Sequence, residues 1–80
     1  MRKSIHSPEY DAFCSLLRQL RLGAGLQQHE LSERLGKPQS FVSRYESGHR
    51  RLDLLELRQI CQALDISLTE FVERFERLLP

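Results

Sequence analysis

The sequence lacks long hydrophobic runs and has few cysteines, and both absences exclude classes of protein. No apolar stretch approaches the roughly 18 residues of a membrane-spanning helix, and no apolar segment follows the basic residues near position 1. The two cysteines, Cys14 and Cys61, have no Cys-x-x-Cys motif and no histidine pair beside them. We therefore expect a cytoplasmic protein without membrane contact, whose cysteines are reduced core residues; a disulfide between them is the less favoured alternative.

The sequence also lacks a cluster of catalytic or metal-binding residues. The three histidines are isolated from other ligand types, no nucleophile stands beside a base, and no phosphate-binding loop is present. Eighty residues are too few for a multidomain enzyme. We expect no catalytic site, no metal and no cofactor.

An excess of charge of one sign is absent as well. The chain contains 12 Lys plus Arg and 11 Asp plus Glu, a formal net charge of +1, which argues against a polycationic tail and against an acidic chaperone. The distribution is uneven, however. Residues 1–51 hold nine basic and five acidic residues (+4), and residues 52–80 hold three basic and six acidic residues (−3). The chain therefore has a basic and an acidic part.

What the sequence does contain is helical spacing of apolar residues along nearly its whole length, without strand-like alternation or a hairpin turn. Capping residues, prolines and glycines divide the chain into five helices. The first follows Ser7-Pro8 and ends at Gly23, the second spans 28–35, the third runs from Pro38 to Ser47, and the last two occupy 53–79 and open with Asp53-x-x-Glu56 and Ser67-x-x-Glu70. The expected fold is all-α, a five-helix orthogonal bundle, with residues 1–8 as an N-terminal arm and 9–80 as one domain.

Residues 28–47 have the spacing of a helix-turn-helix, in which a short break containing glycine joins two helices. Gly36 stands where the chain needs a left-handed residue, and Ser32 is small where the helices approach each other. On a helical wheel, Val42 and Tyr45 turn toward the second helix, whereas the opposite face is hydrogen-bonding and carries no acid. The residues of that face are Gln39, Ser40, Ser43 and Arg44.

This polar face suits the major groove of DNA, where each base pair presents a distinct pattern of donors and acceptors. Gln39 can pair with adenine and Arg44 with guanine, each through two hydrogen bonds, so we predict base contacts from all four residues. Phe41 is expected to touch a thymine methyl group or a sugar as well as to pack inward. The predicted contacts with the DNA backbone are Gln28, Lys37, Phe41, Arg50 and Arg51. The alternative for Arg50 and Arg51 is that both side chains are solvated and contact no phosphate.

Arg21 and Glu46 are expected to form a structural ion pair. On its wheel, Arg21 falls within the apolar stripe of the first helix, and a buried guanidinium needs a carboxylate partner. Glu46 falls at the border of the buried side of the third helix. It is therefore the carboxylate that we pair with Arg21.

These residues resemble the phage repressor and Cro-like helix-turn-helix family, also called the XRE-type regulators. The resemblance covers residues 17–72 and is carried by Leu17 to Arg21, Gly25 to Ser32, Leu35 to Gly48 and Ala63 to Leu68. It implies a lambda-repressor-like DNA-binding domain that binds pseudo-palindromic double-stranded DNA as a dimer, with phosphate anchoring by Gln28 and base contacts at the four positions above. Gln27 departs from the Thr or Ser that often precedes the second helix, so we expect a less rigid start there.

The fifth helix carries more apolar residues than one side of a small bundle needs. We therefore expect a symmetric homodimer, with the recognition helices about 34 Å apart on one face of DNA. Two of the apolar residues, Phe71 and Phe75, are expected to pack mainly in the core, and any part of them that stays exposed is expected to lie in the dimer interface. The predicted interface residues are Phe71, Phe75, Leu78 and Leu79.

The sequence thus predicts a sequence-specific DNA-binding transcriptional regulator, in the first place a repressor that occupies a promoter with the recognition helix 39–47 in the major groove. Activation through contact with polymerase stays open. The alternative is an antitoxin-like or adaptor module that binds an unidentified protein partner, with DNA binding secondary.

Overall fold

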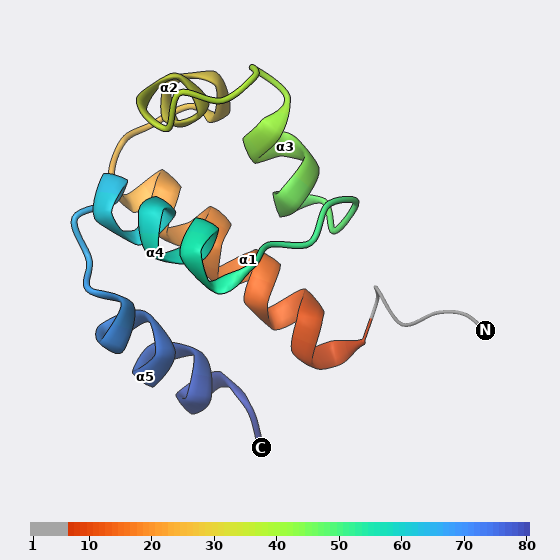
Figure 1. Ribbon diagram of the computed structural model, residues 1–80. Coiled ribbons are helices and arrows are strands. Elements are labelled where there is room, and N and C mark those ends of the chain that lie inside the picture. Colours follow the sequence, from red (N-terminus) through yellow and green to blue (C-terminus); the bar gives the residue numbers. More distant parts are fainter. Residues whose placement is uncertain (1–6) are drawn as a thin grey trace.

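The computed structural model describes residues 7–80 and contains five α-helices joined by short connections (Figure 1). They are α1 (Pro8–Gly23), α2 (Gln28–Arg34), α3 (Phe41–Glu46), α4 (Leu54–Ala63) and α5 (Leu68–Leu78). No strand occurs between residues 7 and 80, and the predicted all-α, five-helix fold is confirmed. None of these helices has the length and apolar character needed to cross a membrane. Of the predicted arm, residues 1–6 lie outside the described residues, whereas Ser7 and Pro8 start α1.

The predicted capping residues start three of the helices. Ser7 and Ser67 each accept a hydrogen bond at 3.0 Å through Oγ from the backbone N–H three residues on. At α4 the two capping partners satisfy each other: Asp53 Oδ1 accepts from the N–H of Glu56 at 2.7 Å, and Glu56 Oε1 accepts from the N–H of Asp53 at 3.0 Å. Each bond satisfies an N–H group that the helix itself leaves without a partner.

The start of α2 has a hydrogen bond that its capping residue did not predict. Gln27 is not a good capping residue, but Glu30 Oε1 accepts a hydrogen bond from the N–H of Gln27 at 2.8 Å. The carboxylate of Glu30 also lies in the first turn, near the positive end of the helix dipole. A residue inside the helix therefore supplies an interaction that the capping position itself lacks.

The third helix is shorter than predicted, because it begins at Phe41 and not at Pro38. The N–H of Phe41 donates to the carbonyl oxygen of Pro38 at 2.9 Å. This bond spans three residues and closes a single turn, whereas a regular helix uses bonds that span four. Gln39 and Ser40 therefore lie in the turn, which corrects the predicted recognition helix of 39–47.

Ser32 and Gly36 connect α2 to this turn. The hydroxyl of Ser32 is fully buried; it donates to the carbonyl oxygen of Gln39 at 3.3 Å and accepts from the N–H of Val42 at 3.2 Å. Gly36 has a φ of +67°, the left-handed conformation that its position predicted. The two residues fix where the chain turns and where α3 begins.

The core lies where all five helices meet, and it joins α5 to α1 through aromatic rings. Phe13 of α1 makes edge-to-face contacts with Phe71 and Phe75, with ring centroids 5.8 and 5.9 Å apart. Both cysteines are buried and free, as predicted, and burial raises the pKa of the Cys61 thiol to about 11. The apolar side chains with less than 2% exposure are Leu17, Leu31, Val42, Tyr45, Ile60, Cys61 and Phe71.

Candidate nucleic-acid interface

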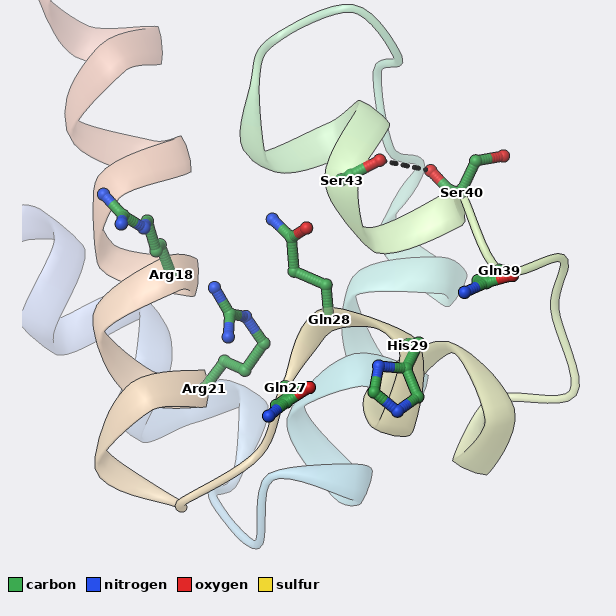
Figure 2. Close-up of a pocket in the computed structure, with 8 residues that line it drawn as sticks. All are labelled: Arg18, Arg21, Gln27, Gln28, His29, Gln39, Ser40 and Ser43. Carbon is green, nitrogen blue, oxygen red and sulfur yellow. Dashed lines mark hydrogen bonds between the residues drawn. The ribbon is translucent and has the colours of Figure 1, made fainter.

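The turn before α3 and the outward face of α3 form a ridge made by Gln39, Ser40, Ser43 and Arg44, with a hollow on each side. The first hollow lies between the ridge and helices α1 and α2 (Figure 2). Its lining residues are Arg18, Arg21, Gln27, Gln28, His29, Gln39, Ser40 and Ser43. The second hollow is lined by Lys37, Pro38, Ser40, Phe41, Arg44 and Arg50. No carboxylate is among these lining residues, and the lining cations Arg18, Lys37 and Arg44 have no ion-pair partner among residues 7–80, so both hollows favour an anionic ligand.

All four predicted base-contact residues belong to the ridge. Gln39, Ser40 and Arg44 are exposed, and Ser43 is half-buried. The hydroxyl of Ser43 donates to the carbonyl oxygen of Ser40 at 3.1 Å, a bond that Figure 2 shows at the edge of the first hollow. Arg44 lines the second hollow and has no ion-pair partner among residues 7–80. The donors of the Arg44 guanidinium are therefore available to a ligand.

Arg21 and Glu46 form a buried ion pair at the base of the first hollow. Arg21 Nε lies 2.7 Å from Glu46 Oε2, Arg21 Nη2 lies 3.0 Å from Oε1, and Arg21 Nη1 donates to the carbonyl oxygen of Leu26 at 2.8 Å. The hydrogen bonds to Glu46 raise the pKa of Arg21 above its ordinary value. The pair predicted from the two helical wheels is thus present, and it ties α1 to α3.

The same carboxylate positions Gln28. Gln28 Nε2 donates to Glu46 Oε1 at 3.0 Å, and Figure 2 shows the side chain in the space between α1 and Ser43. The amide has a second N–H that can face a ligand in the hollow. Because Arg21 holds Glu46 and Glu46 holds Gln28, a buried ion pair orients a polar group at the candidate interface.

Phe41, which was predicted to pack inward and to touch the DNA backbone, is buried and lines the second hollow. Its ring is only 6% exposed and packs edge-to-face on Tyr45, with centroids 5.4 Å apart. At the first position of α3 this side chain packs into the core. Lys37 Nζ and Arg50 Cζ lie 5.5 and 4.9 Å from the centroid of the Phe41 ring. The ring therefore supports two cations of the second hollow through cation–π contacts and offers little surface of its own.

The two consecutive arginines after α3 differ in their surroundings. Arg50 lines the second hollow and forms two hydrogen bonds with Glu56, Nη2 to Oε2 at 2.8 Å and Nη1 to Oε1 at 3.1 Å. These bonds raise the pKa of Arg50 and lower the pKa of Glu56. Arg51 lies outside both hollows, with its Cζ 4.6 Å from the ring centroid of Tyr10. The structure thus brings Lys37 and Arg50 together at the ridge but not Arg51.

The predicted dimer residues divide into buried and exposed side chains. Phe71 is 1% exposed and belongs to the core, which corrects its assignment to an interface. Phe75 and Leu79 are half-buried, and Leu78 is 55% exposed. Val72 on α5 is exposed as well, and so are Leu54 and Leu55 at the start of α4, none of which was in the predicted interface.

Sequence reasoning did not predict three residues of the first hollow as site residues, Arg18, Gln27 and His29. Arg18 lies outside the apolar stripe of its helix, a position that indicates exposure and nothing more. Its proximity to the ridge depends on how α1 packs against α2 and α3. The sequence signal of a helix-turn-helix covers the second and third helices only, and so it does not include a side chain of α1.

Comparison with known proteins places the chain in a family. The family model described as Helix-turn-helix matches residues 17–71, and an XRE-family like protein from Pseudomonas syringae pv. tomato str. DC3000 has a similar solved structure at 39% sequence identity. The chain belongs to the XRE-type helix-turn-helix family. This family comprises DNA-binding transcriptional regulators. The match to the Pseudomonas protein covers 96% of this chain and 94% of that one, with a TM-score of 0.85.

More distant structures share the fold of this XRE-type chain. The restriction-modification controller protein C.Esp1396I, solved as a tetramer with its natural 35 base-pair operator, is 22% identical and has a TM-score of 0.80; 90% of this chain and 95% of that one are covered. The clp gene regulator ClgR from C. glutamicum is 23% identical and has a TM-score of 0.77, with 92% and 95% covered. No curated protein sequence matches the chain.

Proposed function

We propose that this protein is a transcriptional repressor that binds a pseudo-palindromic operator as a homodimer and acts in the cytoplasm. The observation that carries the proposal is the ridge of exposed hydrogen-bonding side chains between two hollows without a lining carboxylate. A ridge of this kind fits the major groove, and donor-rich hollows on both sides fit the two sugar–phosphate backbones that border the groove. Occupation of a promoter by such a dimer would exclude polymerase.

Base recognition is proposed for the exposed part of the ridge. Arg44 can donate two hydrogen bonds to guanine, and Gln39 can exchange two with adenine. Ser40 and Ser43 can donate to or accept from several bases, and Ser43 can exchange its bond with the Ser40 carbonyl for one with DNA. Gln39 lies in the turn rather than the helix, so its reach depends on the Ser32 hydrogen bond that holds the turn.

Contacts with the DNA backbone are proposed for Gln28 in the first hollow and for Lys37 and Arg50 in the second. The ring of Phe41 holds both cations in place. Arg50 also bonds to Glu56, so a phosphate has to share or displace that carboxylate. We therefore rank Lys37 as the stronger backbone contact of the second hollow.

Dimerisation is proposed through the exposed apolar side chains of α4 and α5, which Figure 1 shows running in opposite directions. These side chains are Val72 and Leu78 on α5, joined by Leu54 and Leu55 on α4. The described chain measures 33 × 26 × 21 Å, and one turn of DNA is about 34 Å long. Two copies placed side by side can therefore present two ridges to successive major grooves. The operator complex of C.Esp1396I provides a precedent for assembly on DNA within this fold.

An in vitro selection from random duplex DNA tests the proposal, because it returns the preferred bases, the half-site symmetry and the half-site spacing together. We expect two inverted half-sites with centres about one helical turn apart. Failure to enrich any sequence at low salt would exclude the proposed function.

Arg44→Ala tests base recognition on the selected site. We expect a loss of about 1 to 3 kcal/mol in binding and relaxed preference at one base position in each half-site, because a bidentate contact with guanine is removed. Binding is measured by fluorescence anisotropy on the selected site and on its single-base variants. Arg58→Ala is the matched control, since Arg58 is an exposed arginine of α4 that lines neither hollow. Unchanged affinity and preference in Arg44→Ala would favour a module that binds a protein partner.

A further inference from the structure

Arg18 is an exposed arginine of α1 whose position at the candidate interface is not explained by the helix-turn-helix itself. It lies one turn before Arg21 and lines the first hollow together with residues of the ridge. Figure 2 shows Gln28 between Arg18 and Ser43, so that Arg18 stands on the α1 side of the hollow, across from the ridge. A third helix therefore contributes a cation to this surface.

The charge of Arg18 is uncompensated among residues 7–80. Arg18 forms no ion pair there, whereas Arg21 in the same hollow is bound by Glu46. The positions one turn away from Arg18 on α1 are Cys14, Ser15, Arg21 and Leu22, and none of them is a carboxylate. The positive charge and the N–H donors of the exposed Arg18 guanidinium are thus available to a ligand bound in the first hollow.

The geometry of the major groove indicates which ligand that is. The groove is about 12 Å wide, so a ridge placed in it has a sugar–phosphate backbone on each side. Lys37 and Arg50 occupy the side of the second hollow. We propose that Arg18 binds a phosphate of the opposite strand, the strand that passes over the first hollow; this inference rests on the proposed DNA-binding function.

Phosphate is the ligand that suits Arg18 best, for two reasons. A guanidinium is permanently charged and can bind a phosphate through two parallel hydrogen bonds. Arg18 also stands off the ridge, so it does not face the base edges that Arg44 and Ser40 face. Its contribution should therefore be independent of DNA sequence and should weaken with salt.

Three variants test this role against DNA of the selected sequence and against random duplex DNA, at several salt concentrations. Arg18→Ala should weaken binding to both about tenfold and reduce the slope of log affinity against log salt by about one, because one phosphate contact is lost. Arg18→Lys should retain most of the affinity, since it keeps the charge. Arg58→Ala, with the same change of net charge away from both hollows, should behave as the wild type. Thermal unfolding should be the same for all, because both arginines are exposed.

Unchanged affinity and salt slope in Arg18→Ala would overturn this inference while leaving the proposed function intact, provided that Arg44→Ala still loses specificity. Absence of DNA binding by the wild type would overturn both. Equal losses in Arg18→Ala and Arg58→Ala would show that net charge alone matters, and would also overturn the inference.

Phosphate ethylation interference locates the contact. We expect one phosphate in each half-site at which ethylation weakens the wild type but no longer weakens Arg18→Ala. A second phosphate should respond in the same way to Lys37→Ala, and it should lie on the other strand bordering the major groove. If Arg18→Ala and Lys37→Ala became insensitive to ethylation of the same phosphate, or of phosphates on the same strand, the proposed placement of Arg18 would be wrong.

Discussion

Tyr45 is 1% exposed, and its hydroxyl is the buried side-chain polar group that has no hydrogen-bond partner among residues 7–80. Burial raises the pKa of Tyr45 well above its ordinary value, so the hydroxyl stays neutral in the folded protein. A buried donor without a partner costs about 1 to 3 kcal/mol. We therefore expect Tyr45→Phe, which removes only this oxygen, to leave the free energy of unfolding unchanged or to raise it by about 1 kcal/mol in urea denaturation.

Tyr10→Phe is the matched control for this prediction. The hydroxyl of Tyr10 donates to the carbonyl oxygen of Arg50 at 3.4 Å and is half-buried, so its removal should lower stability by less than about 1 kcal/mol. If Tyr45→Phe instead lost more than about 1 kcal/mol, the Tyr45 hydroxyl would have to make a stabilising hydrogen bond, and the interpretation of an unpaired group would be wrong.

At the scale of elements, the start of α4 depends on the ionisation of Glu56. This carboxylate accepts hydrogen bonds from Arg50 and from the N–H of Asp53, and both lower the pKa of Glu56 below its ordinary value of 4.5. A carboxylate with a lowered pKa stabilises the fold fully above its unfolded-state pKa, and the stabilisation is lost as the pH falls through the folded-state pKa. We expect Glu56→Gln to be less stable than the wild type near neutral pH, and the difference to shrink as the pH falls below 4.5.

Urea denaturation of both proteins across this pH range measures the effect. Glu73→Gln is the control, because Glu73 is an exposed carboxylate of α5 outside the capping positions, and its stability should follow the wild type throughout. A constant difference between Glu56→Gln and the wild type, from neutral pH to well below 4.5, would show that the charge of Glu56 is not what stabilises α4.

The helices could be predicted from sequence because their signals are local. Capping residues such as Ser7, Asp53 and Ser67 act on N–H groups three residues away, and apolar spacing repeats within each helix. The start of α3 could not be predicted in the same way. It depends on the Ser32 hydroxyl, which belongs to another helix and bonds to the turn before α3.

The candidate site was predictable to a similar extent. The ridge follows from one helix-turn-helix segment, and the Arg21 pair follows from a physical requirement, since a buried guanidinium needs a carboxylate. For Phe41 the wheel predicted inward packing together with a surface contact, because an aromatic ring at the edge of a wheel can turn either way, and packing on Tyr45 accounts for its burial. Arg18 was missed because the packing of α1 against the ridge is a tertiary feature.

At the scale of the whole molecule, the uneven charge of the sequence coincides with the division of proposed roles. Residues 1–51, with a net charge of +4, contain both hollows and the ridge, and residues 52–80, with −3, contain α4 and α5. The acidic part is repelled by DNA, which favours approach through the ridge. Because the total is only +1, non-specific attraction to DNA is weak, and we expect the affinity to depend on the proposed contacts of residues such as Arg44 and Lys37.

The exposed apolar side chains of α5 provide the test of assembly. Phe71 and Phe75 pack on Phe13 and are needed by the core, so substitutions there would confuse folding with dimerisation.

Val72 and Leu78 are 44% and 55% exposed. We expect the double variant Val72→Asp/Leu78→Asp to remain folded and to sediment as a monomer where the wild type sediments as a dimer, because charges would be buried without partners in a symmetric interface. Its affinity for the full operator should fall to that for a single half-site. Leu22→Asp, a substitution at a leucine of α1 that is also 55% exposed, should remain dimeric. A wild type that stays monomeric with and without operator, or a Leu22→Asp protein that dissociates while the α5 variant does not, would exclude this interface.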